Sequence, residues 1–104
     1  LMQKAADLNP NDPQIWLLWG NIKRKANKLL EADEKYKKAY GLSPENHIIL
    51  NVYGQTRGRL ADYETALDLL TAALNTEFEI SSKKHEIINR TSIAETLLAW
   101  YELL

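Results

Sequence analysis

The sequence predicts an all-α fold in which antiparallel helix pairs stack one behind the other into a solenoid. Apolar residues recur at helical spacing along most of the chain, and proline, glycine or asparagine residues interrupt this pattern at short intervals. Small side chains also repeat after 34 residues, so that Gly54 follows Gly20 and Ala66 follows Ala32. Because this period fits one helix-turn-helix unit, we expect two copies of the same helix pair.

The first helix pair is expected to begin at Pro13. Asp12 can cap a helix over 13–25, and proline in the first turn costs nothing because its N–H is not needed there. Gly20 interrupts this helix, and we expect its missing Cβ to let the second helix approach closely. The aromatic residues that fall on the internal apolar stripe are expected in the core: Trp16, Trp19, Tyr36 and Tyr53.

A turn at Asn27 is expected to connect the two helices of the first pair, since asparagine tolerates the left-handed backbone that ends helices. The second helix then covers 28–40, with alanines such as Ala32 at its contact points. Gly41 is expected to stop this helix in the left-handed conformation, and Pro44 prevents its continuation.

The second pair repeats this plan over 46–59 and 62–75. Asp62 is its expected internal N-cap, in the role that asparagine, aspartate, serine and threonine fill at helix starts. Ala66 lies one period after Ala32, so we expect the same close crossing of the two helices.

After residue 75 the period fails. We therefore expect a longer connection through 76–81 and then one extended helix over 82–104, with a break at 89–92 as the competing interpretation. The chain ends in an apolar run without a stop signal, so we expect it to be a fragment of a longer protein. The residues expected on the buried stripe of the last helix are Ile87, Ala94, Leu97, Leu98 and Tyr101.

The two copies resemble the tetratricopeptide repeat (TPR) family, whose pattern runs Trp-x2-Leu-Gly-x2-Tyr, Ala-x3-Phe and then Pro. Gly20 and Ala32 with Tyr36 carry the first match, and a basic residue, Lys23 or Arg57, stands where the family has an aromatic residue. The resemblance implies a right-handed superhelix in a single domain. Its expected parts are a partial repeat over 1–12, repeats over 13–46 and 47–80, and the extended helix over 82–104.

The composition excludes several classes of protein. The 104 residues are 45% hydrophobic and 26% charged, which suits a folded unit rather than a disordered tail. No apolar run reaches the ~18 residues of a membrane span and no signal peptide is recognisable, so we expect a cytoplasmic protein without membrane contact. The absence of cysteine removes disulfides and thiol chemistry. The net charge of -1 argues against a nucleic-acid partner.

Few residues are placed for catalysis. His47 and His85 lack the spacing of metal ligands, and the isolated glycines form no phosphate-binding loop. Scattered carboxylates on outer faces fit solvated charge better than an acid–base pair. We therefore expect no enzyme activity, no catalytic residue, no metal site and no cofactor.

A binding groove is what the resemblance implies, because the first helix of each TPR pair lines a concave surface that holds a peptide or a helix. Lys25 and Arg59 lie one period apart and could hold a carboxylate or phosphate, or else only complement the ends of their helices. The family's clamp for chaperone C-termini is absent, since Leu17 and Val52 replace its lysine and asparagine. The groove residues that the resemblance implies are Gln14, Leu17, Asn21, Arg24, Lys25, Ile48, Asn51, Gln55, Gly58 and Arg59.

These observations predict a non-catalytic protein–protein interaction scaffold that binds a peptide or helix of a partner protein. One alternative is a structural spacer or a self-association arm of a larger multidomain protein, such as a signalling ATPase, with exposed terminal helices forming a homo-oligomer. Another is single-stranded RNA binding, which Arg24, Lys25 and Arg59 favour and the overall charge opposes.

Overall fold

The computed structural model describes residues 1–77 and 83–103, and the side chains of residues 1–76 and 90–103. Every regular element in these ranges is an α-helix and none is a strand, which confirms the all-α prediction. Within the same ranges, no helix combines the length and the apolar character needed to cross a membrane. The helices are α1 (Met2–Leu8), α2 (Pro13–Lys25), α3 (Leu29–Leu42), α4 (His47–Arg59), α5 (Tyr63–Glu77) and α6 (Lys83–Leu103).

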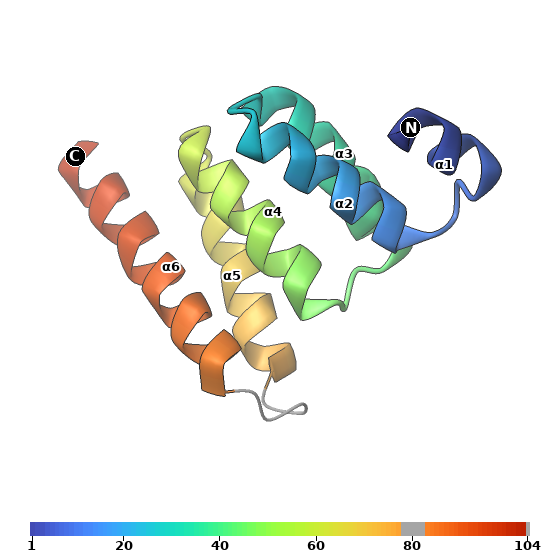
Figure 1. Ribbon diagram of the computed structural model, residues 1–104. Helices are drawn as coiled ribbons and strands as arrows, with labels where there is room; N and C mark the ends of the chain where they lie inside the picture. Colours follow the sequence, from blue (N-terminus) through green and yellow to red (C-terminus); the bar gives the residue numbers. More distant parts are fainter. Residues whose placement is uncertain (78–82, 104) are drawn as a thin grey trace.

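The helices pack mainly against their neighbours in the sequence. The closest pairs are α2 with α3 and α4 with α5, while α3 packs on α4 and α5 on α6. Figure 1 shows α2 and α4 on one side of the molecule and α3 and α5 behind them, with α6 beside the second pair. A further contact joins α4 to α6. The first helices of the two pairs and the last helix therefore border the same side.

Side-chain caps define three helix starts, of which those at Asp12 and Asp62 were predicted. The Asp12 carboxylate accepts from the Gln14 N–H at 3.0 Å, with Pro13 following it in the first turn of α2. Asn46 caps α4 by accepting from the Ile48 N–H. Asp62 accepts more weakly from the Thr65 N–H, at 3.4 Å. The sequence pattern thus located these starts to within one residue.

Both helix pairs turn through the same motif. The N–H of Lys28 donates to the carbonyl of Lys23, and one period later the N–H of Asp62 donates to the carbonyl of Arg57, each at 2.9 Å. These bonds are typical of a Schellman motif, which requires a left-handed residue just before the donor. That residue is Asn27 in the first pair, as predicted, and Ala61 in the second.

Glycine allows the close approach within each pair. A Cβ at Gly20 would lie 2.5 Å from Cε1 of Tyr36, and a Cβ at Gly54 would lie 2.8 Å from Cγ of Leu70. Both distances are too short for an unchanged neighbour, so the prediction about Gly20 is confirmed. The alanines expected at contact points are also fully buried: Ala32, Ala39, Ala66 and Ala73.

The tryptophans depart from the predicted core. Tyr36 and Tyr53 are buried, but Trp16 and Trp19 are only half-buried. The two indoles stack with their ring centroids 5.5 Å apart, and the Lys35 ammonium lies 3.9 Å from the centroid of the Trp19 ring. The prediction that both indoles are core residues holds only in part: Trp16 is half-buried and packs against the hydrophobic core cluster, whereas Trp19 lies at the edge of the first pair beneath Lys35.

The ends of α3 and α5 also differ from expectation. Gly41 does not adopt a left-handed backbone, and α3 continues through it to Leu42. The helix stops instead at Ser43, which precedes the proline that cannot continue it. Helix α5 extends through Glu77, so the predicted connection does not begin at residue 76. Residues 78–81 of that connection lie outside the described part of the chain.

Helix α6 is continuous from Lys83 to Leu103, so the alternative break at 89–92 was wrong. The predicted buried stripe was also wrong, because Leu98 is 60% exposed, Tyr101 is 75% exposed, and Ala94 and Leu97 are exposed as well. Ser92 and Thr96 are buried instead. Thr96 faces Gly58, where a Cβ would lie 3.3 Å from Oγ1 of Thr96. The side chain of Ile87, the start at residue 82 and Leu104 lie outside the described residues.

Candidate functional site

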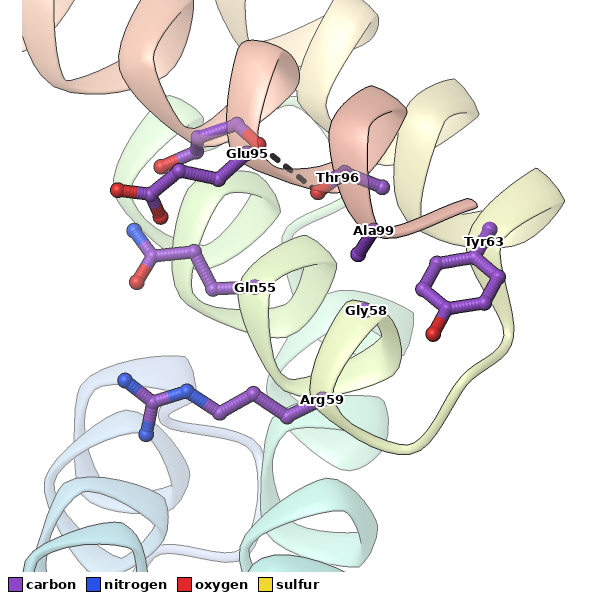
Figure 2. A pocket seen from close by; sticks show the side chains of 8 residues that line it. Gln55, Gly58, Arg59, Tyr63, Glu95, Thr96 and Ala99 are labelled. Carbon is purple, nitrogen blue, oxygen red and sulfur yellow. Dashed lines mark hydrogen bonds between the residues drawn. The ribbon is translucent and has the colours of Figure 1, made fainter. Parts of the chain in front are cut away.

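An open depression of about 360 Å³ lies between α4 and α6. It forms where the small residues Gly58 and Thr96 bring the two helices together. Figure 2 shows Gln55 on α4 and Glu95 on α6 extending to the same side of it. Its lining residues are mainly polar: Gln55, Gly58, Arg59, Tyr63, Ser92, Glu95, Thr96 and Ala99.

The predicted groove residues of α2 lie in different environments. Gln14 and Lys25 are exposed, and Asn21 and Arg24 are half-buried. Leu17 is 5% exposed and belongs to the hydrophobic core cluster, which leaves little of its side chain for a ligand. The accessible part of this face therefore lies on either side of Leu17.

The predicted groove residues of α4 are likewise divided into exposed and buried ones. Ile48 and Arg59 are exposed, whereas Asn51 is 8% exposed and accepts a hydrogen bond from Nε2 of Gln55. Gln55, Gly58 and Arg59 all line the depression beside α6. The structure therefore brings three of the predicted residues together near the C-terminal end of α4.

A buried tyrosine connects this region with α2. The Tyr36 hydroxyl donates to Oδ1 of Asn21 at 2.6 Å, and the tyrosine side chain is fully buried. Burial raises the pKa of the Tyr36 hydroxyl, and the positive charges of Arg24 and Arg59 oppose this increase. Both guanidinium groups therefore act on the same hydroxyl although they belong to different helices.

Figure 2 shows Arg59 extending from the end of α4 toward the ribbon of the first helix pair, away from Glu95. Arg24 follows Asn21 by three residues, which places the two on the same face of α2. The sequence pattern singled out Lys25 as the partner of Arg59, whereas Arg24 is the α2 residue whose charge acts on the Tyr36 hydroxyl together with that of Arg59.

Several polar residues of the depression were missed by the sequence interpretation: Tyr63, Glu95 and Thr96. Glu95 and Thr96 were missed because the register of α6 was assigned from its apolar residues, and Tyr63 was missed because it lies on α5, outside the helices that the groove pattern includes.

The chemistry that the region offers is hydrogen bonding and charge. Guanidinium groups donate, the Glu95 carboxylate accepts, and the Gln55 amide does both. In the part of the chain whose side chains are described, no three His, Asp or Glu residues are grouped as metal ligands would be.

Comparison with known proteins gives a partial match. No family model matches the chain. The chain is 30% identical over 96 residues to "Protein adenylyltransferase fic-1" of Caenorhabditis briggsae and 31% identical over 98 residues to the protein of the same name from Caenorhabditis elegans. Each match covers 92% of this chain and 18% of the relative. The chain thus spans less than a fifth of the curated relatives that it matches.

Proposed function

We propose that the chain is a non-catalytic, TPR-like repeat that binds a peptide or helix of a partner protein along the side bordered by α2, α4 and α6. In this proposal the helix pairs form a right-handed solenoid, and its concave face is the binding groove. The observation that carries the proposal is the open polar depression between α4 and α6, which is lined by Gln55 and Arg59.

The arrangement of donors and acceptors supports a peptide ligand. An extended peptide presents N–H and C=O groups that need partners when they leave water. The Gln55 amide can satisfy either group, the Arg59 guanidinium can satisfy a carbonyl, and the Glu95 carboxylate can satisfy an N–H. A shallow site of this kind fits an elongated ligand better than a small molecule, because small-molecule sites are enclosed and mostly apolar.

The relatives suggest where such a module would act. They bear the name of an adenylyltransferase, and this chain matches less than a fifth of their length. We propose that the chain corresponds to a binding segment of a longer protein, in which any transferase chemistry is carried by other residues. The cytoplasmic location predicted from the sequence stays a prediction.

A blocked groove tests the proposal. Peptides are first selected from a random library on the unmodified protein, and their affinity is then measured for two variants. In Glu95→Trp the new side chain fills the depression from an exposed position. Glu102→Trp is the control, because Glu102 is exposed on α6 outside the depression. We expect Glu95→Trp to weaken binding by ~10-fold or more and Glu102→Trp to leave it unchanged. Recovery of no peptide, or equal binding by both variants, would contradict the proposal.

Self-association is a second candidate, and the exposed apolar face of α6 favours it. Leu97, Leu98, Tyr101 and Leu103 are all at least half exposed, which is more apolar surface than a single helix normally presents to water. If this face joins two copies, light scattering gives a dimer mass that Leu98→Glu reduces to that of a monomer. A monomeric mass at all concentrations excludes this function.

A further inference from the structure

Two arginines of the groove, like the neighbouring Lys25, differ from the ion-paired basic residues around them. Arg57 pairs with Asp33 at 3.2 Å, and Lys23 pairs with Glu31 at 3.7 Å. Arg24 and Arg59 form no ion pair with any residue whose side chain the structure describes. The groove therefore holds positive charge that the described side chains do not neutralise.

The Tyr36 hydroxyl fixes the orientation of the Asn21 side chain. It donates to Oδ1 of Asn21, so the Nδ2 donors of Asn21 are the ones left for other partners. Tyr36 itself is held rigidly, since its ring is fully buried and contacts the backbone at Gly20. Arg24 lies one helical turn after Asn21 on α2, and the Arg59 side chain extends from α4 toward the first helix pair.

The charged side chains of the groove are basic toward α2 and acidic at α6. Glu95 on α6 lines the depression that Arg59 also borders, and the Arg59 side chain extends away from Glu95 toward the first helix pair. A ligand that crosses from α2 to α6 would meet donors first and a carboxylate second. The groove is therefore complementary to a peptide with an anionic side chain at one end.

We propose that the donor cluster of Asn21, Arg24 and Arg59 binds an anionic side chain, a carboxylate or a phosphate, of the peptide in the groove. This inference rests on the proposed function and adds the chemistry of the ligand. Arginine suits the role because its planar group makes paired hydrogen bonds to either anion. The acidic end of the peptide lies between α2 and α4, and the rest extends toward Glu95.

Peptide selection followed by a mutant cycle tests the inference. Short random peptides are selected on the unmodified protein, and the acidic residue of a selected peptide is replaced by glutamine. We expect aspartate and glutamate to be enriched, and the replacement to weaken binding about 10-fold on the unmodified protein but less than about 2-fold on the Arg24→Gln/Arg59→Gln variant. Lys4→Gln, at an exposed position on α1, is the matched control and should retain the full difference.

Two further probes separate the sources of the anion. A peptide with phosphoserine in place of the acidic residue should bind when the serine peptide does not, because the donors recognise either anion. A single-stranded oligouridine should not displace the peptide. If oligouridine displaces the peptide from the unmodified protein but does not bind the Arg24→Gln/Arg59→Gln variant, the ligand of the donor cluster is RNA and the peptide assignment is overturned.

Failure of the proposed function and failure of this inference give different results. Selection of no peptide would contradict the proposed function together with the inference. Selection of peptides without acidic enrichment, or an equal loss on the unmodified protein and the double variant, would overturn the inference and leave the groove proposal intact.

Discussion

Ala61 adopts the same left-handed backbone as Asn27, with φ of 67° compared with 60°. Both residues end the first helix of their pair, and both precede the residue that donates back to the helix. Asparagine tolerates this conformation, whereas alanine is strained in it by its Cβ. The second pair therefore contains strain that the first pair lacks.

Relief of this strain should stabilise the protein. We expect Ala61→Gly to raise the free energy of unfolding by about 0.5 to 1 kcal/mol, and Asn27→Ala to lower it by a similar amount. Urea denaturation of the two variants measures both changes. A loss of stability in Ala61→Gly would show that the turn does not store this strain.

Glycine at the crossing point gives a second prediction. Gly20→Ala should cost about 1 to 3 kcal/mol, because its Cβ would overlap the buried ring of Tyr36. Gly41→Ala is the matched control, since Gly41 lies within α3 with no atom within 4 Å of the added Cβ. It should gain about 0.5 to 1 kcal/mol from helix propensity. Thermal unfolding that moves both variants in the same direction would be inconsistent with this packing.

The ion pair between α3 and α4 predicts a pH dependence. Burial raises the pKa of Asp33 from its ordinary value of 3.8, although Arg57 lies 3.2 Å away and opposes the shift. The nearest atoms, Oδ1 and Nε, are buried and lack a hydrogen bond, so the attraction does not compensate for the lost hydration. A carboxyl with a raised pKa binds its proton more tightly in the folded state. Its contribution to stability therefore falls as the pH rises through 3.8 toward the raised value.

Removal of this carboxyl should change the pH profile in a defined direction. Compared with Asp33→Asn, the unmodified protein should lose stability as the pH rises from below 3.8 through the raised pKa of Asp33, and the difference should be constant above that pKa. Urea denaturation across this range measures it. A difference that changes in the opposite direction would mean that Arg57 outweighs burial.

Local features of the helix pairs were predictable from the sequence. Glycine and alanine mark the crossings because only small side chains fit there, and Asp12 and Asn27 mark a start and a turn through their own hydrogen-bonding chemistry. The basic residues at the aromatic positions of the TPR pattern were not explained by the pattern. The structure explains them through their partners, since Lys23 pairs with Glu31 and Arg57 with Asp33.

The register of α6 could not be predicted in the same way. The helix carries apolar residues on more than one face, so periodicity alone does not determine which face packs. That choice depends on contacts with α4, where Gly58 accommodates Thr96 rather than a leucine. The candidate site also depends on these contacts between α4 and α6, because Glu95 faces the depression only in this register. Gln55 and Arg59 were predictable because they lie on the regular part of the repeat.

The most direct test of the account is to map a selected peptide on the isotope-labelled protein by NMR. We expect the chemical-shift changes to be concentrated on the groove side, at Asn21, Gln55, Arg59 and Thr96. Residues exposed on the helices behind it, such as Lys37 on α3 and Asp68 on α5, should be unchanged. Changes concentrated on α3 and α5 would contradict the claim that α2, α4 and α6 form the binding face.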